Sequence, residues 1–223
     1  MNRSKFRVNA LIVSALLTGA GWAPTVAAQA ADMTFFLTSV NPGKGADFGG
    51  LDGADAHCAT LSKASGSGKT PWRAYLSTTG VVGVPGIEAR DRIGKGPWQN
   101  IKGVVIAKNV DDLHSANSNM GKDTALSEKA EIISGSGDTP NAHDILTGSD
   151  PTGRYSTAVG DTTCTNWTSS AAGSAIVGHH DRKGLQNNRH AVSWNSSHGT
   201  RGCGMDALKS TGGAGLIYCF LAN

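Results

Sequence analysis

The sequence predicts an α+β domain in which a mixed antiparallel sheet is combined with one or two helices and a long loop region. The chain ends on glycines followed by an unbroken apolar and aromatic run, residues 212–223, which is typical of a strand buried on both faces in mid-sheet. Apolar residues at helical spacing occur in residues 53–63. Gly, Ser, Thr, Asn and Asp dominate residues 135–211, and a loop of that length has to be pinned in a compact domain.

The N-terminal residues have the pattern of an export signal. Basic residues precede an apolar stretch, residues 8–17, and small residues stand at positions 28 and 30. We predict a signal peptide over residues 1–30 and a single domain over residues 31–223, secreted or periplasmic. The apolar stretch is too short to span a membrane as a stable helix.

Charge argues against two classes of partner. The predicted signal peptide holds three of the 20 Lys and Arg residues and none of the 17 Asp and Glu residues, so the remainder has 17 of each and no net formal charge. Nucleic acids and anionic membrane surfaces call for a concentrated basic patch. We therefore expect neither nucleic-acid binding nor membrane insertion, and the sequence leaves the oligomeric state open.

The first elements follow from local patterns. Residues 33–40 are rich in strand formers and predict the first strand. Asp52 is positioned to cap the helix over residues 53–63, and Gly66 and Gly68 are positioned to end it.

Shorter elements follow in the next sixty residues. Residues 72–77 alternate and predict a second strand, residues 103–107 a short buried strand, and residues 110–114 one helical turn. The mixed charges of residues 88–92 are typical of a solvated surface. Residues 124–133 fit a hairpin or a helix, and the pattern does not decide between them.

Four cysteines in an exported chain without a Cys-x-x-Cys motif predict two disulfides rather than a metal knuckle. Three pairings are possible. We favour Cys58–Cys219, which ties the last strand to the first helix, and Cys164–Cys203, which closes the Gly- and Asn-rich excursion.

Five of the seven histidines fall after residue 140, several beside carboxylates. Imidazole with carboxylate is what a zinc site or an oriented general base requires, although the spacing matches no established metal motif. In the alternative interpretation, these side chains satisfy loop carbonyls. The candidate ligand-binding residues are Trp98, Asn141, His143, Asp144, His179, His180, Asp181, Arg182, Trp194, Asn195 and His198.

The tryptophans divide into two groups. Trp167 and Trp194 stand near structural cysteines, where core packing is the commoner role, and we expect them to pin the polar region. Trp98 stands between turn residues, so it is the better candidate for an exposed face that stacks on a sugar.

The order of these motifs resembles that of a known family. Residues 53–58, followed by Trp72-Arg73-Ala74-Tyr75-Leu76-Ser77, are similar to the endostatin helix and the arginine–aromatic–leucine strand after it. Residues 147–154, then Cys164-Thr165-Asn166-Trp167, resemble the later endostatin run, and the last two cysteines complete the pattern. The resemblance implies a C-type-lectin-like fold of the endostatin type with two nested disulfides, as in exported bacterial proteins of this kind.

The functions implied by the resemblance transfer poorly. Endostatin-type zinc binding uses N-terminal histidines, but the predicted mature chain begins Ala31-Asp32-Met33. Heparin binding rests on an arginine cluster, which a neutral chain does not favour. The calcium loop of true C-type lectins is not matched either, because Ser196 follows Trp194-Asn195 and Thr139-Pro140-Asn141 precedes Cys164.

We therefore expect a secreted binding module that recognises a glycan or another extracellular surface polymer through residues 141–198. The first alternative is a zinc hydrolase built on His143, Asp144, His179, His180 and Asp181. The second is a scaffold without a small ligand. No Gly-x-Ser-x-Gly motif and no spare cysteine is present, which favours binding over catalysis. If the protein uses a metal cofactor, we expect zinc or calcium.

Overall fold

The computed structural model describes residue 1 and residues 30–223. The predicted signal peptide therefore lies almost wholly outside the described residues. Its last residue, Ala30, is fully buried against the core. Among the described helices, none is long and apolar enough to cross a membrane.

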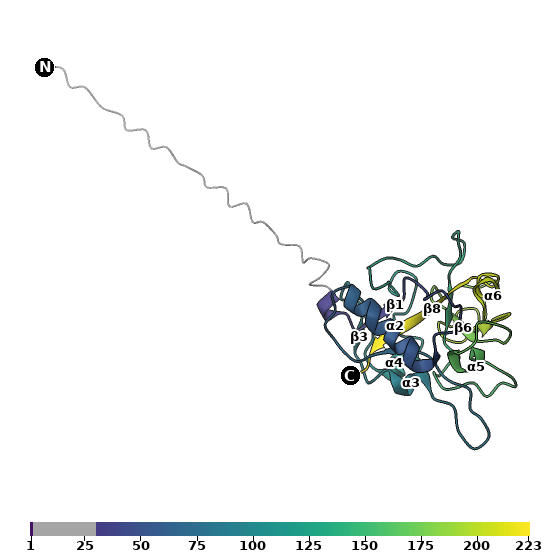
Figure 1. Cartoon of the computed structure of the whole chain (residues 1–223). Coiled ribbons are helices and arrows are strands. Elements are labelled where there is room, and N and C mark those ends of the chain that lie inside the picture. Colours follow the sequence, from purple (N-terminus) through teal and green to yellow (C-terminus); the bar gives the residue numbers. More distant parts are fainter. Residues whose placement is uncertain (2–29) are drawn as a thin grey trace.

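The C-terminal strand β8 (Gly213–Leu221) is the centre of the fold, as predicted (Figure 1). Its C-terminal half pairs antiparallel with β1 (Phe35–Leu37) and with β2 (Trp72–Ala74), so it lies between them. Its N-terminal half runs parallel to β5 (Asp144–Leu146). The sheet is thus mixed, and residues 216–220 of its central strand are buried.

Two further strands extend the sheet into the polar region. β6 (Ile176–His179) pairs antiparallel with β5, and β7 (His198–Gly199) pairs antiparallel with β6. The order along this path is β1-β8-β5-β6-β7. As a result, Asp144 on β5, His179 on β6 and His198 on β7 lie on neighbouring strands although they are far apart in the sequence.

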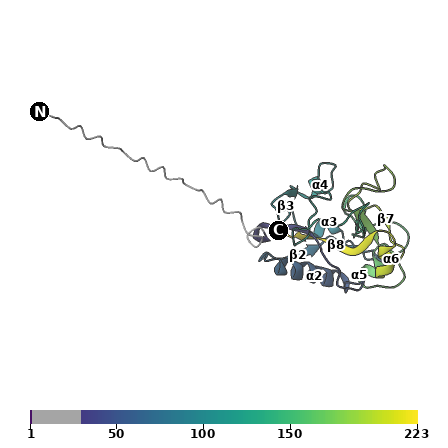
Figure 2. The same ribbon diagram turned by 90° about the horizontal axis from the view of Figure 1, so that it is seen from above.

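Helix α2 (Gly50–Ala64) covers one face of the sheet (Figure 2). The prediction that Asp52 caps this helix is wrong, because the cap residue is Gly49 in a left-handed conformation and no side chain caps the helix. Asp52 lies in the first turn instead. The prediction that Gly66 ends the helix is confirmed: its φ is 96° and its N–H donates to the carbonyl of Lys63.

The opposite face of the sheet is covered by short elements. They are α3 (Ala89–Arg92), the hairpin of β3 (Trp98–Gln99) and β4 (Val105–Ala107), and α4 (Val110–Leu113). Residues 124–133 form turns and an irregular segment, neither hairpin nor helix.

Successive side chains of β8 divide between the two cores. Ile217 and Cys219 pack on the α2 side, whereas Tyr218 and Phe220 pack on the other. This alternation is the consequence of the two-residue period of a strand buried on both faces.

The mixed charges of residues 88–92 are not merely a solvated surface. The Arg92 side chain is only 11% exposed and donates to both carboxylate oxygens of Asp55 at 2.9 and 2.8 Å. Asp55 also accepts from the backbone N–H of Ala74 at 2.8 Å. The interpretation of this segment as surface is therefore wrong for Arg92, which fastens α3 to α2 and β2.

Both favoured disulfides are present, Cys58–Cys219 and Cys164–Cys203, so all four cysteines are paired. The second closes the polar region, where α5 (Cys164–Trp167) and α6 (Met205–Lys209) are the only helices among the described residues 135–211. All four residues of α5 have φ between 50° and 68°, a left-handed turn. Trp167 is buried and its Nε1–H donates to the carbonyl of Ser77 at 2.7 Å, which confirms its predicted pinning role.

Candidate metal-binding site

The register of three neighbouring strands brings a carboxylate and two imidazoles to one face of the sheet. Asp144 on β5 lies directly opposite His179 on β6. His198 on β7 lies opposite Val177, which is two residues from His179 and therefore on the same face.

A third imidazole, His143, reaches the cluster from just before β5. The β5–β8 register shifts between Asp144 and Ile145, so regular alternation does not extend to His143. Gly212 leaves room for the ring, because a Cβ atom there would lie 3.3 Å from His143 Nε2. A glycine is favoured there because φ is 103°, which other residues rarely adopt, and because the imidazole ring packs against it.

The three imidazoles converge on one oxygen atom. Asp144 Oδ1 lies 3.3 Å from Nε2 of His143, 3.2 Å from Nε2 of His179 and 3.4 Å from Nε2 of His198. The side chains of Asp144, His179 and His143 are almost wholly buried, whereas that of His198 is 39% exposed. The cluster is therefore closed on the protein side and open at His198.

The second nitrogen of each ring faces an acceptor. Nδ1 of His179 lies 2.8 Å from the carbonyl of Ala191, and Nδ1 of His198 lies 3.2 Å from that of Gly199. Nδ1 of His143 lies 3.3 Å from Asp181 Oδ1. Because carbonyl and carboxylate oxygens only accept, each Nδ1 carries a proton, and Nε2 is the nitrogen of each ring that faces Asp144.

Asp181 is the support of His143. It accepts from the backbone N–H of Ser136 at 2.6 Å and of Lys183 at 3.1 Å, and a Cβ at Gly135 would lie 2.6 Å from its Oδ2. Burial by itself raises the pKa of Asp181, but the hydrogen bonds from His143 and these amides outweigh it and hold the pKa below its usual range. Asp181 thus stays ionised and orients the ring.

The centre of the cluster needs positive charge. Among the described residues, no partner with hydrogen-bond geometry is present for either oxygen of Asp144 or for Nε2 of His179. An unpaired buried polar group costs about 1–3 kcal/mol of stability. Burial raises the pKa of Asp144, but His179, His198 and His143 outweigh it and lower the pKa to about 2. The carboxylate is ionised at neutral pH, so protons on the imidazoles or a metal ion must balance it.

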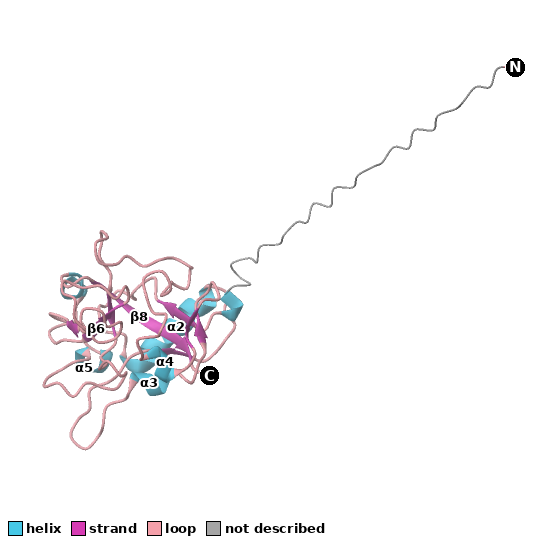
Figure 3. Ribbon diagram, turned by 180° about the vertical axis from the view of Figure 1, so that it is seen from behind, coloured by secondary structure: helices cyan, strands magenta, loops and turns pink. Residues whose placement is uncertain are grey.

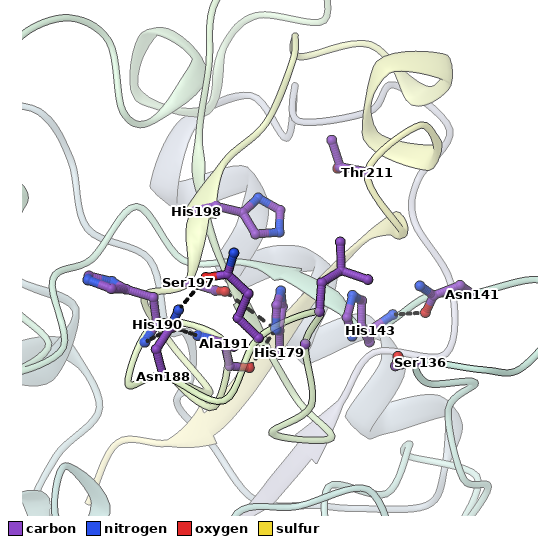
Figure 4. Close-up of a pocket in the computed structure, with 13 residues that line it drawn as sticks. Ser136, Asn141, His143, His179, Asn188, His190, Ala191, Ser197, His198 and Thr211 are labelled. Carbon is purple, nitrogen blue, oxygen red and sulfur yellow. Dashed lines mark hydrogen bonds between the residues drawn. The ribbon is translucent and has the colours of Figure 1, made fainter.

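The cluster forms one wall of a cavity of about 460 Å³. Figure 4 shows His143, His179 and His198 around one space, with Asn141 beside His143. Apart from the histidines, no lining residue from the described part of the chain is ionisable. The rim is formed mainly by Ser136, Asn141, Gln186, Asn188, His190 and Thr211.

Two predicted site residues do not join the cluster. His180 follows His179 in the chain and lies on the other side of the strand, fully buried, with Nε2 3.1 Å from the carbonyl of Ser134. Arg182 donates from Nε to the carbonyl of Val192 at 3.3 Å. The grouping of His180 with the metal ligands is therefore wrong, and His198 takes its place.

The aromatic candidates are core residues. Trp98 has no exposed surface and its Nε1–H donates to the carbonyl of Leu221 at 3.1 Å, so the predicted stacking face is wrong. Trp194 is 4% exposed and packs on Tyr75 with ring centroids 4.8 Å apart. Asn195 is also buried, and its amide donates to the hydroxyl of Tyr75 at 3.0 Å. Neither is available to a ligand.

Sequence reasoning missed the neutral rim, Ser136, Gln186, Asn188 and Thr211, because isolated polar loop residues carry no local signal. The choice between His179 and His180 did have one. Residues 176–179 form a strand, and its two-residue period separates the two rings.

No protein-family model matches the chain, and a comparison with curated proteins found no relative.

Proposed function

We propose that His143, Asp144, His179 and His198 hold a zinc ion, and that this ion anchors an extracellular ligand in an exported binding module. The observation that carries the proposal is the set of distances to Asp144 Oδ1, 3.2, 3.3 and 3.4 Å. Zinc binds imidazole nitrogen and carboxylate oxygen at about 2.0–2.1 Å, and the edge of a tetrahedron of that size is about 3.3–3.4 Å. Each imidazole nitrogen therefore already lies at the separation from this oxygen that neighbouring zinc ligands have.

The donor set favours zinc over the hard cations. Calcium takes six to eight oxygen ligands and magnesium near-octahedral oxygen, whereas this cluster offers one carboxylate and imidazole nitrogens. Imidazole suits zinc, copper, iron and nickel. The outer hydrogen bonds of the three rings are those that hold metal-ligating histidines in their tautomers.

One coordination position faces the cavity. Ligand atoms of His143, Asp144 and His179 lie within 4.8 Å of one another. His198 stands at the exposed side, with its Nε2 3.4 Å from Asp144 Oδ1 and its ring centroid 5.1 Å from that of His179. Three protein ligands with an open position are typical of sites that bind an external molecule. His198 completes the shell or yields its place to a ligand oxygen.

The surroundings favour binding over hydrolysis. A metal hydrolase needs a free acid or base near the metal-bound water. Here Asp144 is itself a proposed ligand, and Asp181 lies behind the ring of His143 with its oxygens already engaged. A neutral hydroxyl and amide rim instead suits a hydroxyl-rich polymer such as a glycan.

We also propose a C-type-lectin-like fold of the endostatin type and an extracellular or periplasmic location. The α+β architecture, the mixed sheet and the two nested disulfides support a C-type-lectin-like fold of the endostatin type. Two disulfides are compatible with an extracellular or periplasmic protein.

The test is metal analysis of the oxidised protein after gentle purification. We expect one zinc per chain in the wild type and in His57→Ala, a matched control whose histidine lies on α2, and less than a tenth of this amount in His179→Ala. Zinc at a hundred times its dissociation constant should stabilise the wild type by about 2.7 kcal/mol. A metal-free wild type whose melting does not respond to zinc would refute the proposal.

A further inference from the structure

We infer that the ligand of this site is an acidic sugar, whose carboxylate binds the metal with one oxygen and accepts a hydrogen bond from Asn141 with the other. The inference rests on the proposed zinc site. It follows from the charge of the site, from the free end of one amide, and from the composition of the rim.

The charge seen from the cavity is positive. A divalent ion with the single charge of Asp144 and three neutral imidazoles leaves one positive charge. Asp181 has no exposed side-chain surface and lies on the far side of His143. The described lining residues add no Asp, Glu, Lys or Arg, so an anionic oxygen ligand is the complement of this charge.

Asn141 offers a donor beside the metal ligands. Its Oδ1 accepts from the backbone N–H of His143 at 3.2 Å, which fixes Nδ2 as the end that is free. A Cβ atom at Gly212 would lie 2.7 Å from Asn141 Nδ2 and 3.3 Å from His143 Nε2. The amide donor and the imidazole therefore both pack against this glycine, and the two side chains lie next to each other in the cavity lining (Figure 4).

This pair of groups selects a carboxylate. A metal ion and an amide N–H both require an acceptor, and a carboxylate presents two acceptor oxygens that can meet both at once. Two adjacent sugar hydroxyls also offer two oxygens, but they bring no negative charge to balance the site. The preference of the site is thus for an anionic group with two acceptors.

The rim favours a sugar over a peptide. Ser136, Thr211 and Gln186 supply hydroxyl and amide groups, whereas the one large apolar side chain in the lining, Leu185, is fully exposed and forms no pocket. The tryptophans nearby are buried, so affinity has to come from the charge and from hydrogen bonds.

The experiment measures binding to the zinc-loaded protein by calorimetry, with glucuronate and glucose as matched sugars that differ in the carboxylate. We expect glucuronate to bind at least tenfold more tightly. Asn141→Ala should weaken glucuronate by about tenfold or more, since a hydrogen bond to a charged group is lost, without changing the zinc content. Asn187→Ala, an exposed amide outside the cavity lining, is the control and should change neither.

The outcomes separate this inference from the proposed function. One zinc per chain with equal affinity for glucuronate and glucose overturns the acidic-sugar inference and leaves the metal site standing. Protein that never takes up zinc overturns both. N-acetylglycine binding as tightly as glucuronate assigns the carboxylate to a peptide end and overturns the sugar.

Discussion

The two halves of this molecule are stabilised by different means. Around β8 and α2, apolar side chains fill both faces of the sheet and regular hydrogen bonds link the strands. In residues 135–211, Figure 3 shows mostly loop around β6, and no helix or strand of this described segment exceeds five residues. There the order comes from a disulfide and from side chains bonded to the backbone.

This difference between the halves determines where a functional site can form. An apolar core buries its surface and leaves no polar group to spare, whereas a loop region held by polar contacts must bury imidazoles and carboxylates to satisfy its backbone. Here three of those imidazoles face one carboxylate. The less regular half therefore carries the site, and β8 of the regular half holds it in register by pairing with β5.

The largest effect that separates the halves is expected from the disulfides. Removing Cys58–Cys219, with a separation of 161 residues, should cost up to about 5 kcal/mol, and removing Cys164–Cys203, with 39 residues, up to about 4 kcal/mol. Urea unfolding of the two paired Cys→Ala variants measures this. We expect the first loss to destabilise the whole domain and the second to reduce zinc affinity as well. An unchanged zinc affinity in the second variant would show that the site does not depend on the disulfide of the polar region.

A smaller and more local effect is expected at Gly178. A Cβ atom there would lie 1.9 Å from the carbonyl oxygen of Trp194, so Gly178→Ala should push the segment carrying His198 away from β6. We expect a loss of about 1–3 kcal/mol in the free energy of unfolding and a lower zinc affinity. Gly68→Ala, where a Cβ meets nothing within 4 Å, is the control and should change neither quantity.

A third effect should appear mainly in zinc affinity, with a smaller loss of stability because this carboxylate also accepts from two backbone N–H groups. Asp181→Asn keeps the shape of the side chain but weakens its hold on Nδ1 of His143. Loss of such an outer carboxylate typically costs 10–100-fold in metal affinity. Competition with a chromophoric chelator measures it, with the exposed Asp123→Asn as the control. Equal affinities in both variants would show that Asp181 does not orient the ring.

The regular half was largely predictable from local pattern. The apolar run of β8 and the helix spacing of α2 predict those elements, because burial on both faces and on one stripe leaves a periodic trace. The exceptions have non-local causes. Trp98 follows turn residues, but Phe220 from the far end of the chain packs against its ring at 5.3 Å.

The site itself was only partly predictable. Composition placed histidines and carboxylates in one region, and the alternation of β6 could have separated His179 from His180. The convergence of His198 and Asp144 could not be found, since it depends on the pairing of β7 with β6 and of β6 with β5, which no local pattern encodes.

The smallest predicted effect is on the pH dependence of stability, and it arises at a buried polar contact between the two halves. Nδ1 of His114 donates to the carbonyl of Val110 at 2.7 Å, and its Nε2 accepts from the hydroxyl of Tyr75 at 2.7 Å. Tyr75 in turn accepts from Asn195. Burial lowers the pKa of His114, and nearby Arg90 lowers it further, against Asp150 and Asp111, which raise it.

The sign of the pH effect follows from this lowered pKa. Below about pH 6.5, the unfolded chain binds a proton on His114 that the folded chain does not yet bind. The free energy of unfolding should therefore decrease as the pH is lowered, until the pKa of His114 in the folded chain is reached. His114→Gln removes this contribution. We expect the stability of wild type, measured by urea unfolding between pH 7 and pH 5, to fall more steeply than that of the variant. Parallel curves would mean that protonation of His114 does not destabilise the contact between the halves.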